Sequence, residues 1–352
     1  MTFTETILDW YTVKGRDLPW RHTRDPYLIW LSEIILQQTR VGQGMDYWLR
    51  FVQRWPRVED LAAATEDEVL RMWQGLGYYS RARNLHQAAQ QIVARGSFPD
   101  TLQGIKSLKG VGDYTAAAIA SFAFGLPSAV VDGNVYRVLA RHYGIDVPIH
   151  SAQGKKVFTQ LAQSLLPPRQ AAAFNQGMMD FGATQCTPAS PRCELCPLQE
   201  SCLAFRTGRI NQLPVKEKKL NVVTRHLTYL YIRCGETTAI RRRGAGDIWQ
   251  GLWEPLLFEE SAADARHQPE TDHLKEALLP GATLLRHHVK HVLTHRILVA
   301  DFYFLQTDTP PPLPKDYRWV KETELDSYAF PRLLENLFAS LAQTQGEVTS
   351  KP

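Results

Sequence analysis

The sequence predicts two domains of different class, an all-α region over residues 1–205 and an α+β domain over residues 222–345. In the first part apolar residues recur at steps of three and four, as in the run 117–124, which is the period of an amphipathic helix. In the second part the segments 227–233 and 297–305 are rich in β-branched and aromatic residues, which favours strands.

The segment between these two regions, residues 206–221, is polar and basic, so we expect an exposed linker there. Within the second domain, helices are expected near 273–279 and after Pro331. Residues 346–352 are predicted to form a frayed tail.

The bulk composition limits the class of protein but not its function. The chain has 352 residues, of which 44% are hydrophobic, enough for a sizeable core. No apolar run approaches the roughly 20 residues that a membrane-spanning helix requires, so the sequence predicts no membrane association. The net charge of +4 suits a polyanionic partner, but so modest an excess is also common in proteins that bind no nucleic acid.

Four cysteines follow the pattern C-x6-C-x2-C-x5-C, namely Cys186, Cys193, Cys196 and Cys202. The sparse, odd number of cysteines and the lack of a signal segment predict reduced thiols that bind a metal rather than disulfides. Four thiolates suit either Zn²⁺ or a [4Fe-4S] cluster. Structural zinc usually takes two closely spaced cysteine pairs and only one pair is present here, so the spacing favours the cluster.

Two glycines interrupt the helical pattern in the segment Leu108–Asp113, which predicts a helix-hairpin-helix motif. Gly110 and Gly112 let the backbone turn tightly on either side of Val111, and the N–H groups at the start of the next helix can bind a phosphate. Such a hairpin holds DNA without reading its sequence. A Gly-x-Gly turn can also be an ordinary helix connection, so the motif alone leaves both interpretations open.

Asp132 ends an apolar run and precedes a predicted helix that ends near Gly144. One interpretation is that Asp132 caps this helix. The second, compatible with the first, is that the N–H groups and the helix dipole keep its carboxylate ionised, so that it can stabilise a developing sugar cation.

Glu33 lies in a predicted helix that is opened by Asp25 as the cap and by Pro26 in its first turn. The apolar Ile29 and Leu36 share its helix face, so we expect burial to raise the pKa of Glu33. A carboxyl with a raised pKa beside one with a depressed pKa allows the first to donate a proton while the second stays charged. The alternative is a buried glutamate that is satisfied by an arginine or by backbone groups.

In their order along the chain, the hairpin, the Asp132 motif and the cysteine loop resemble the endonuclease III superfamily of base-excision DNA glycosylases. Within it, the chain is similar to the MutY family of adenine glycosylases in three segments: Leu31–Thr39, Gly75–Tyr79 and Phe174–Asp180. The match spans nearly the whole chain. Bifunctional members carry a lysine where this hairpin has Tyr114, so the resemblance implies simple hydrolysis of the glycosidic bond.

The resemblance implies removal of adenine opposite 8-oxoguanine or G from double-stranded DNA, with the adenine flipped out of the helix. Glu33 would protonate the purine and Asp132 would stabilise the sugar cation, supported by Tyr114 and Asn134. The residues implied to line the adenine pocket are Trp20, Arg21 and Gln176. Those implied to fill or inspect the opened duplex are Gln38, Thr39, Leu76 and Tyr78.

The second domain resembles the Nudix-like lesion-recognition domain of this family in the segment Asp247–Trp253. The glutamate-rich metal-binding signature of Nudix hydrolases is absent, so pyrophosphate hydrolysis is not expected. Where many relatives have Phe-Ser-His, this chain has Leu293, Thr294 and His295, which keep an apolar wedge and a hydroxyl for reading the lesion. Lys109 replaces the usual proline of the hairpin.

The resemblance also implies a bound [4Fe-4S] cluster, a monomer and a cytoplasmic, nucleoid-associated protein of bacteria. Two other functions remain open. A mismatch thymine or uracil glycosylase of the same superfamily can also lack the lysine, but generally lacks the Nudix-like half. A non-catalytic iron–sulfur DNA-binding protein would have no use for both Glu33 and Asp132.

Overall fold

The computed structural model describes residues 1–216, 222–259 and 272–348. The chain forms two compact units. The helical unit comprises Met1–Ala63 and Asn84–Lys219, and the C-terminal unit comprises Ala64–Arg83 and Leu220–Pro352. The expected order of classes, an all-α region followed by an α+β domain, is confirmed. The placement of Ala64–Arg83 with the C-terminal unit differs from the expected unbroken helical region over 1–205.

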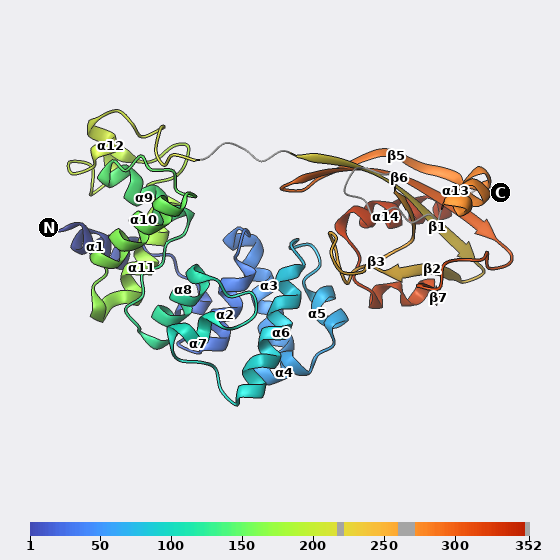
Figure 1. Cartoon of the computed structure of the whole chain (residues 1–352), viewed down its shortest axis with the longest axis horizontal. Helices are drawn as coiled ribbons and strands as arrows, with labels where there is room; N and C mark the ends of the chain where they lie inside the picture. The colour runs from blue at the N-terminus through green and yellow to red at the C-terminus, as the bar shows by residue number, and fades with distance from the viewer. Residues whose placement is uncertain (217–221, 260–271, 349–352) are drawn as a thin grey trace. The chain divides into compact units, whose positions relative to one another are not determined.

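The helical unit consists of short helices that are joined by turns (Figure 1). Its longer elements are α1 (Phe3–Lys14), α2 (Pro26–Ile35), α3 (Val41–Arg54), α4 (Val58–Ala63), α8 (Asp113–Phe124), α9 (Gly133–Tyr143), α10 (Ala152–Leu165) and α11 (Ala171–Asp180). Its short elements are η1 (Pro19–Arg21), α7 (Leu102–Lys106), η2 (Pro168–Gln170), η3 (Phe181–Gln185), η4 (Cys193–Leu195) and α12 (Leu203–Arg206). Helix α6 (Ser80–Arg95) begins in one unit and continues in the other.

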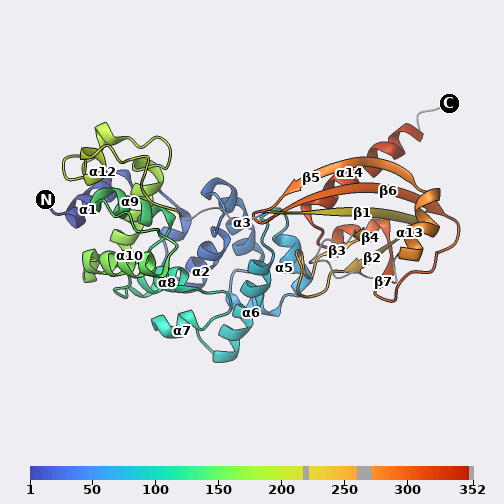
Figure 2. The same ribbon diagram turned by 45° about the horizontal axis from the view of Figure 1, so that its top comes forward.

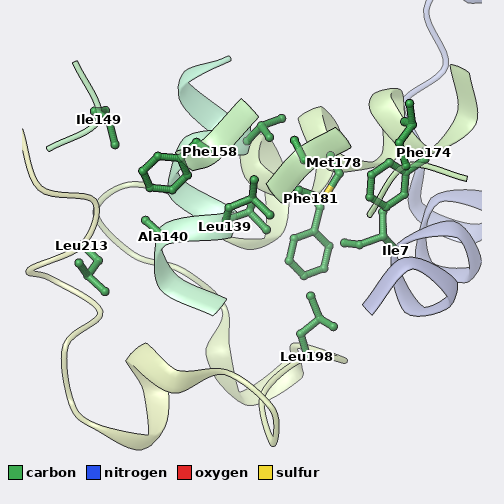
Figure 3. Packing of buried hydrophobic residues seen from close by; sticks show 14 of the residues in the cluster. Ile7, Leu139, Ala140, Ile149, Phe158, Phe174, Met178, Phe181, Leu198 and Leu213 are labelled. Atoms are coloured by element: carbon green, nitrogen blue, oxygen red, sulfur yellow. The ribbon is translucent and has the colours of Figure 1, made fainter. Parts of the chain in front are cut away.

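One hydrophobic core joins α1, α9, α10 and α11 to the cysteine loop. Phe158 and Phe181 are fully buried in this core together with Leu139 of α9. Figure 3 shows Leu198, which lies between the third and fourth cysteines, next to Phe181. The core therefore fixes the cysteine loop and the start of α9 relative to each other.

The C-terminal unit is built on a seven-stranded sheet in which five strands follow the order β3-β2-β1-β6-β5, with β4 paired to β1 and β7 to β2. The strands are β1 (Val223–Cys234), β2 (Thr237–Arg242), β3 (Trp253–Glu254), β4 (Leu256–Glu259), β5 (Thr283–Val292), β6 (Arg296–Thr307) and β7 (Tyr317–Lys321). Strands β1 and β6 are parallel, and the other pairs are antiparallel. The helical elements are α5 (Glu66–Met72), α13 (Asp272–Leu278), η6 (Leu279–Gly281), η7 (Glu322–Ser327) and α14 (Arg332–Val348).

Helix α14 runs along one face of this sheet (Figure 2). Its Leu333 and Leu337 lie one turn apart and are fully buried with Tyr229 of β1 and Phe302 of β6. Leu274 of α13 belongs to a second cluster, which includes alternate residues of β1. Because side chains alternate across a strand, the two clusters lie on opposite faces, so both faces of the sheet are covered. The helices expected near 273–279 and after Pro331 are both confirmed.

The segment 206–221 differs from the exposed linker that its polar composition predicts. Leu213 is buried in the core of the helical unit. The guanidinium of Arg141 donates to the Leu213 carbonyl at 3.1 Å, and the Ile149 N–H donates to the Val215 carbonyl at 3.1 Å. A few apolar side chains among the charges thus hold residues 207–216 on the helical unit, and residues 217–221 lie outside the described residues.

At the C-terminus, α14 continues to Val348, past the predicted end of the domain at residue 345. The rest of the predicted tail, 349–352, lies outside the described residues. None of the helices in the described parts of the chain is both long enough and apolar enough to cross a membrane.

Candidate active site

Glu33 is buried in the last turns of α2, a helix that is capped as expected by Asp25, whose side chain accepts the N–H of Tyr27. The Tyr114 hydroxyl, on α8, donates to Glu33 Oε2 at 2.9 Å. The pKa of Glu33 is raised to about 7, mainly by burial and further by the charge of Asp132, while the Tyr114 hydrogen bond acts in the opposite direction. The expected rise in the pKa of Glu33 is therefore confirmed.

Asp132 caps α9 with a backbone conformation that is extended. Its Oδ1 accepts the N–H groups of Asn134 at 2.8 Å and Val135 at 2.7 Å, and its Oδ2 accepts the Asn134 side-chain amide at 2.8 Å. The expectation of a depressed pKa is wrong, because burial raises the pKa of Asp132 more than these hydrogen bonds and the nearby Arg137 lower it.

The division of roles between the two carboxyls therefore rests on their hydrogen bonds. Asp132 receives three N–H donors and Glu33 receives one hydroxyl. A carboxylate with more donors is the better anion. Glu33 is thus suited to hold a proton and Asp132 to hold a negative charge.

The predicted hairpin joins α7 to α8, which lie side by side (Figure 1). Gly110 has φ of 76°, and a Cβ at this position would lie 2.7 Å from the Cβ of Asn84, so the turn requires glycine. Gly112 is the N-cap of α8, and no side chain in the described part of the chain caps this helix. The N–H groups at the start of α8 are thus left for an external acceptor, as the hairpin motif predicts.

Lys109 also has a local explanation. Its backbone N–H donates to Gln91 Oε1 at 2.8 Å. A proline would lack this N–H, so the replacement of proline by lysine is compensated by a hydrogen bond from the hairpin to α6.

The three predicted pocket residues all lie in the helical unit, but two of them are engaged by other side chains. Arg21 donates both terminal nitrogens to Asp180, at 2.6 and 2.8 Å. Gln176 Oε1 accepts the Tyr11 hydroxyl at 2.6 Å, and Trp20 is buried with its ring edge-on to Trp48. The charge of Arg21 acts to lower the pKa of Glu33, so Arg21 lies near this carboxyl.

Asp180, the partner of Arg21, is a residue that the sequence did not single out. Asp180 is fully buried. Its carboxylate accepts hydrogen bonds from the backbone N–H and the side chain of Arg16 and from the guanidinium of Arg21. Burial acts to raise the pKa of Asp180, but the hydrogen bonds from Arg21 and Arg16 hold it below its usual range. Its place in the motif Phe174–Asp180 was the signal that could have found it.

We expect Asp180→Asn to lower the free energy of unfolding by about 3–5 kcal/mol at neutral pH, because it leaves the buried Arg21 guanidinium without its counter-charge. Urea unfolding that is followed by circular dichroism measures this change. The Asp46→Asn variant, at an exposed position of α3, is the matched control and should unfold as the wild type does. A decrease of less than about 1 kcal/mol for Asp180→Asn would contradict the pairing.

The residues predicted to inspect the duplex lie in strained turns. Gln38 and Thr39 follow the end of α2, and Gln38 has φ of 56°. In the C-terminal unit, Leu76 is buried whereas Tyr78 is half-exposed with φ of 48°. Non-glycine residues in the left-handed region are uncommon and cluster at functional sites.

The predicted lesion-reading segment forms the turn between β5 and β6, closed by the Leu293 N–H donating to the Arg296 carbonyl at 2.8 Å. Thr294 and His295 are exposed at its tip. The hydroxyls of Thr294 and Tyr78 form a hydrogen bond within the C-terminal unit. The structure thus brings together one residue from each of the two predicted reading segments.

All four loop cysteines are partly buried, and none of them forms a disulfide. Burial and the charges of the other three thiols raise the pKa of Cys196 to about 11, so the four side chains lie close enough to act on one another. Backbone N–H groups of Leu198 and Phe205 point at the sulfurs of Cys196 and Cys202, and Arg141 donates to Cys186 Sγ at 3.4 Å. Donors of this kind stabilise thiolates, so the loop is suited to hold a metal or a cluster.

Two family models match the chain. The HhH-GPD superfamily of base excision DNA repair proteins matches residues 31–168, which include Glu33 and Asp132, and the NUDIX domain matches residues 228–340. Both parts of the expected resemblance, the glycosylase region and the Nudix-like domain, are therefore confirmed.

Curated relatives match along most of the chain. The adenine DNA glycosylase of Rattus norvegicus is 43% identical over 96% of this chain and 77% of its own length. That of Buchnera aphidicola subsp. Baizongia pistaciae is 35% identical over 72% of this chain and 73% of its own length. Among solved structures, a thermostable thymine-DNA glycosylase is 34% identical with a TM-score of 0.54, covering 58% of this chain and 95% of that protein. The chain therefore belongs to the adenine DNA glycosylase family.

Proposed function

We propose that the chain removes adenine mispaired with 8-oxoguanine or G from double-stranded DNA by hydrolysing the N-glycosidic bond. The observation that supports this most directly is the pair formed by Glu33, with a pKa of about 7, and Asp132, with three N–H donors. The charge of Asp132 acts on Glu33, and a neutral acid near a charged carboxylate supplies the two groups that hydrolysis of a glycosidic bond requires.

In the proposed reaction Glu33 donates its proton to a ring nitrogen of the flipped adenine. The bond between the base and the sugar then breaks, and its electron pair leaves with the adenine. The Asp132 carboxylate stabilises the positive charge that develops on the sugar. A water molecule adds to the sugar carbon and gives a proton to the Glu33 carboxylate, which leaves an abasic site and restores the acid.

Tyr114 supports hydrolysis rather than strand cleavage. It occupies the hairpin position where bifunctional relatives carry a nucleophilic lysine, and its hydroxyl donates to Glu33. A buried phenol whose pKa is well above its usual range is a poor nucleophile at neutral pH. We infer that Tyr114 orients the Glu33 carboxyl.

Single-turnover excision from three duplexes tests this proposal. We expect removal of A opposite 8-oxoguanine and of A opposite G, without strand cleavage, and no removal of T opposite G. The thymine arm matters because a solved relative of 34% identity is a thymine-DNA glycosylase. Excision of thymine with intact adenine would overturn the assignment and favour the mismatch thymine glycosylase.

We infer that Cys186, Cys193, Cys196 and Cys202 hold one [4Fe-4S] cluster. Structural zinc usually takes two closely spaced cysteine pairs, whereas only Cys193 and Cys196 form such a pair here, which supports a cluster over zinc. Each thiolate would bind a different iron, and when bound the cluster would shape the loop for contact with DNA phosphates.

Metal analysis of the purified protein should find about four iron atoms per chain, and the protein should be brown. The variant Cys234→Ser, at the fifth cysteine, should keep the full iron content, because Cys234 lies in β1 of the other unit. One zinc atom per chain with no iron would contradict the cluster.

We propose that Thr294 reads the oxidised base. Thr294→Ala should weaken binding to duplexes with 8-oxoguanine by roughly 1–3 kcal/mol more than binding to duplexes with G, because only contacts to the N7 hydrogen and the C8 oxygen can discriminate between them. Thr283→Ala, at the exposed start of β5, is the control. Equal losses on both duplexes would show that Thr294 contributes general affinity.

That the protein acts as a monomer in the bacterial nucleoid stays a prediction.

A further inference from the structure

We propose that His287, His288 and Asp301 form a binding site for a divalent transition-metal ion on the C-terminal unit, separate from the cysteine loop and independent of the proposed glycosylase reaction. Their three ligand atoms all lie within 4.8 Å of one another. The site lies on β5 and β6, at the edge of the sheet.

A β-bulge creates this arrangement. Arg286 pairs with Phe302 and Val289 pairs with Ala300, so two residues of β5, His287 and His288, oppose the single Asp301 of β6. His288 has φ of 51°, in the left-handed region. An extra residue in this conformation turns the second histidine toward the first, and the two imidazole centroids lie 3.6 Å apart.

The neighbouring side chains show which face of the sheet the site occupies. Arg286 reaches α14, where its Nε donates to Ser340 at 2.7 Å, and Val289 packs against the core beneath α14. Ala300 and Phe302 also belong to that core. Asp301 and the two bulged histidines therefore point to the opposite face, where the histidines are exposed and Asp301 is partly buried, so solvent and ions reach them.

The distances suit ligands that share one ion. His287 Nδ1 and Asp301 Oδ1 are 3.0 Å apart. Nitrogen and oxygen ligands at about 2.0–2.2 Å from one ion lie about 3.3–3.6 Å apart at tetrahedral angles and about 2.8–3.1 Å apart at right angles, so this spacing suits neighbouring ligands of an ion with more than four ligands. The His288 backbone N–H donates to Asp301 Oδ1 at 2.7 Å and so orients the carboxylate, as outer hydrogen bonds do in metal sites.

The ligand types select the class of ion. Two imidazoles with one carboxylate suit Zn²⁺ and similar transition-metal ions, whereas Mg²⁺ and Ca²⁺ prefer oxygen ligands only. Three protein ligands leave the remaining coordination positions to water. An ion bound here would tie the edge strand β5 to β6 across the bulge.

The test is calorimetric titration of Zn²⁺ into the full-length chain as purified, with its iron content measured before and after. We expect one zinc per chain without loss of iron. The variants His287→Ala, His288→Ala and Asp301→Asn should each weaken the affinity at least about tenfold. The control His273→Ala, at an exposed position of α13, should leave it unchanged.

Thermal unfolding gives a second readout, since an ion that binds only the folded chain raises its melting temperature. The temperature should rise with Zn²⁺ in the wild type and in His273→Ala, but not in the three ligand variants. Unchanged affinity in those variants, no zinc binding at micromolar concentrations, or zinc uptake matched by loss of iron would each overturn the proposal.

Discussion

Asp132→Asn is expected to lower the single-turnover rate of adenine excision at least about 100-fold while leaving duplex affinity nearly unchanged. Asparagine can still cap α9, because its side-chain oxygen can accept the Asn134 and Val135 N–H groups as Asp132 Oδ1 does now. The substitution removes only the negative charge, which interacts with the sugar when it becomes cationic in the transition state.

The matched control for this variant is Asp25→Asn, which makes the same change at the exposed cap of α2. It should excise adenine at the wild-type rate. If Asp132→Asn kept more than about a tenth of the wild-type rate, the charge of Asp132 would not be the stabilising group.

Glu33→Gln is expected to abolish most excision, because an amide cannot donate a proton to the leaving adenine. The change keeps the size of the side chain and an oxygen that can accept the Tyr114 hydroxyl. Glu59→Gln, at an exposed position of α4, is the control and should be fully active. Excision by Glu33→Gln within about tenfold of the wild type would show that another group supplies the proton.

Glu33→Gln should also be more stable than the wild type at alkaline pH. The pKa of Glu33 is about 7 in the folded chain and 4.5 without burial. A carboxyl whose pKa is raised by folding contributes stability below the lower value, and this stability is lost as the pH rises to the higher value. Well above pH 7 the wild type loses about 3 kcal/mol of its free energy of unfolding in this way, and Glu33→Gln should not show this loss. Urea unfolding at pH 8.5 and at pH 4 measures this, with a difference expected only at pH 8.5.

Local patterns allowed the two carboxyls to be predicted. The Asp25-Pro26 start of α2 and the apolar residues one turn from Glu33 determine where this carboxylate lies along the chain, and Gly144 marks the end of α9 after Asp132. These features depend on neighbours within a few residues. Val215 shows where such local patterns fail. It lies in the segment that was expected to be an exposed linker, but its carbonyl accepts a hydrogen bond from Ile149, which is far away in sequence.

The features that escaped prediction depend on contacts between distant segments. Asp180 meets Arg21 across 159 residues of sequence, and no periodicity indicates such a pair. The rise in the pKa of Asp132 depends on how deeply the cap of α9 is buried, which its own sequence does not specify. The bulge at His287 depends on the register between β5 and β6.

The pH dependence of single-turnover excision of A opposite 8-oxoguanine shows whether Glu33 acts as the acid. Because the protonated form of Glu33 is the active one, the rate should fall above a midpoint near pH 7, by about tenfold per pH unit, and it should also fall at acid pH, where Asp132 loses its charge. A rate that stays constant from pH 6 to pH 9 would contradict the account.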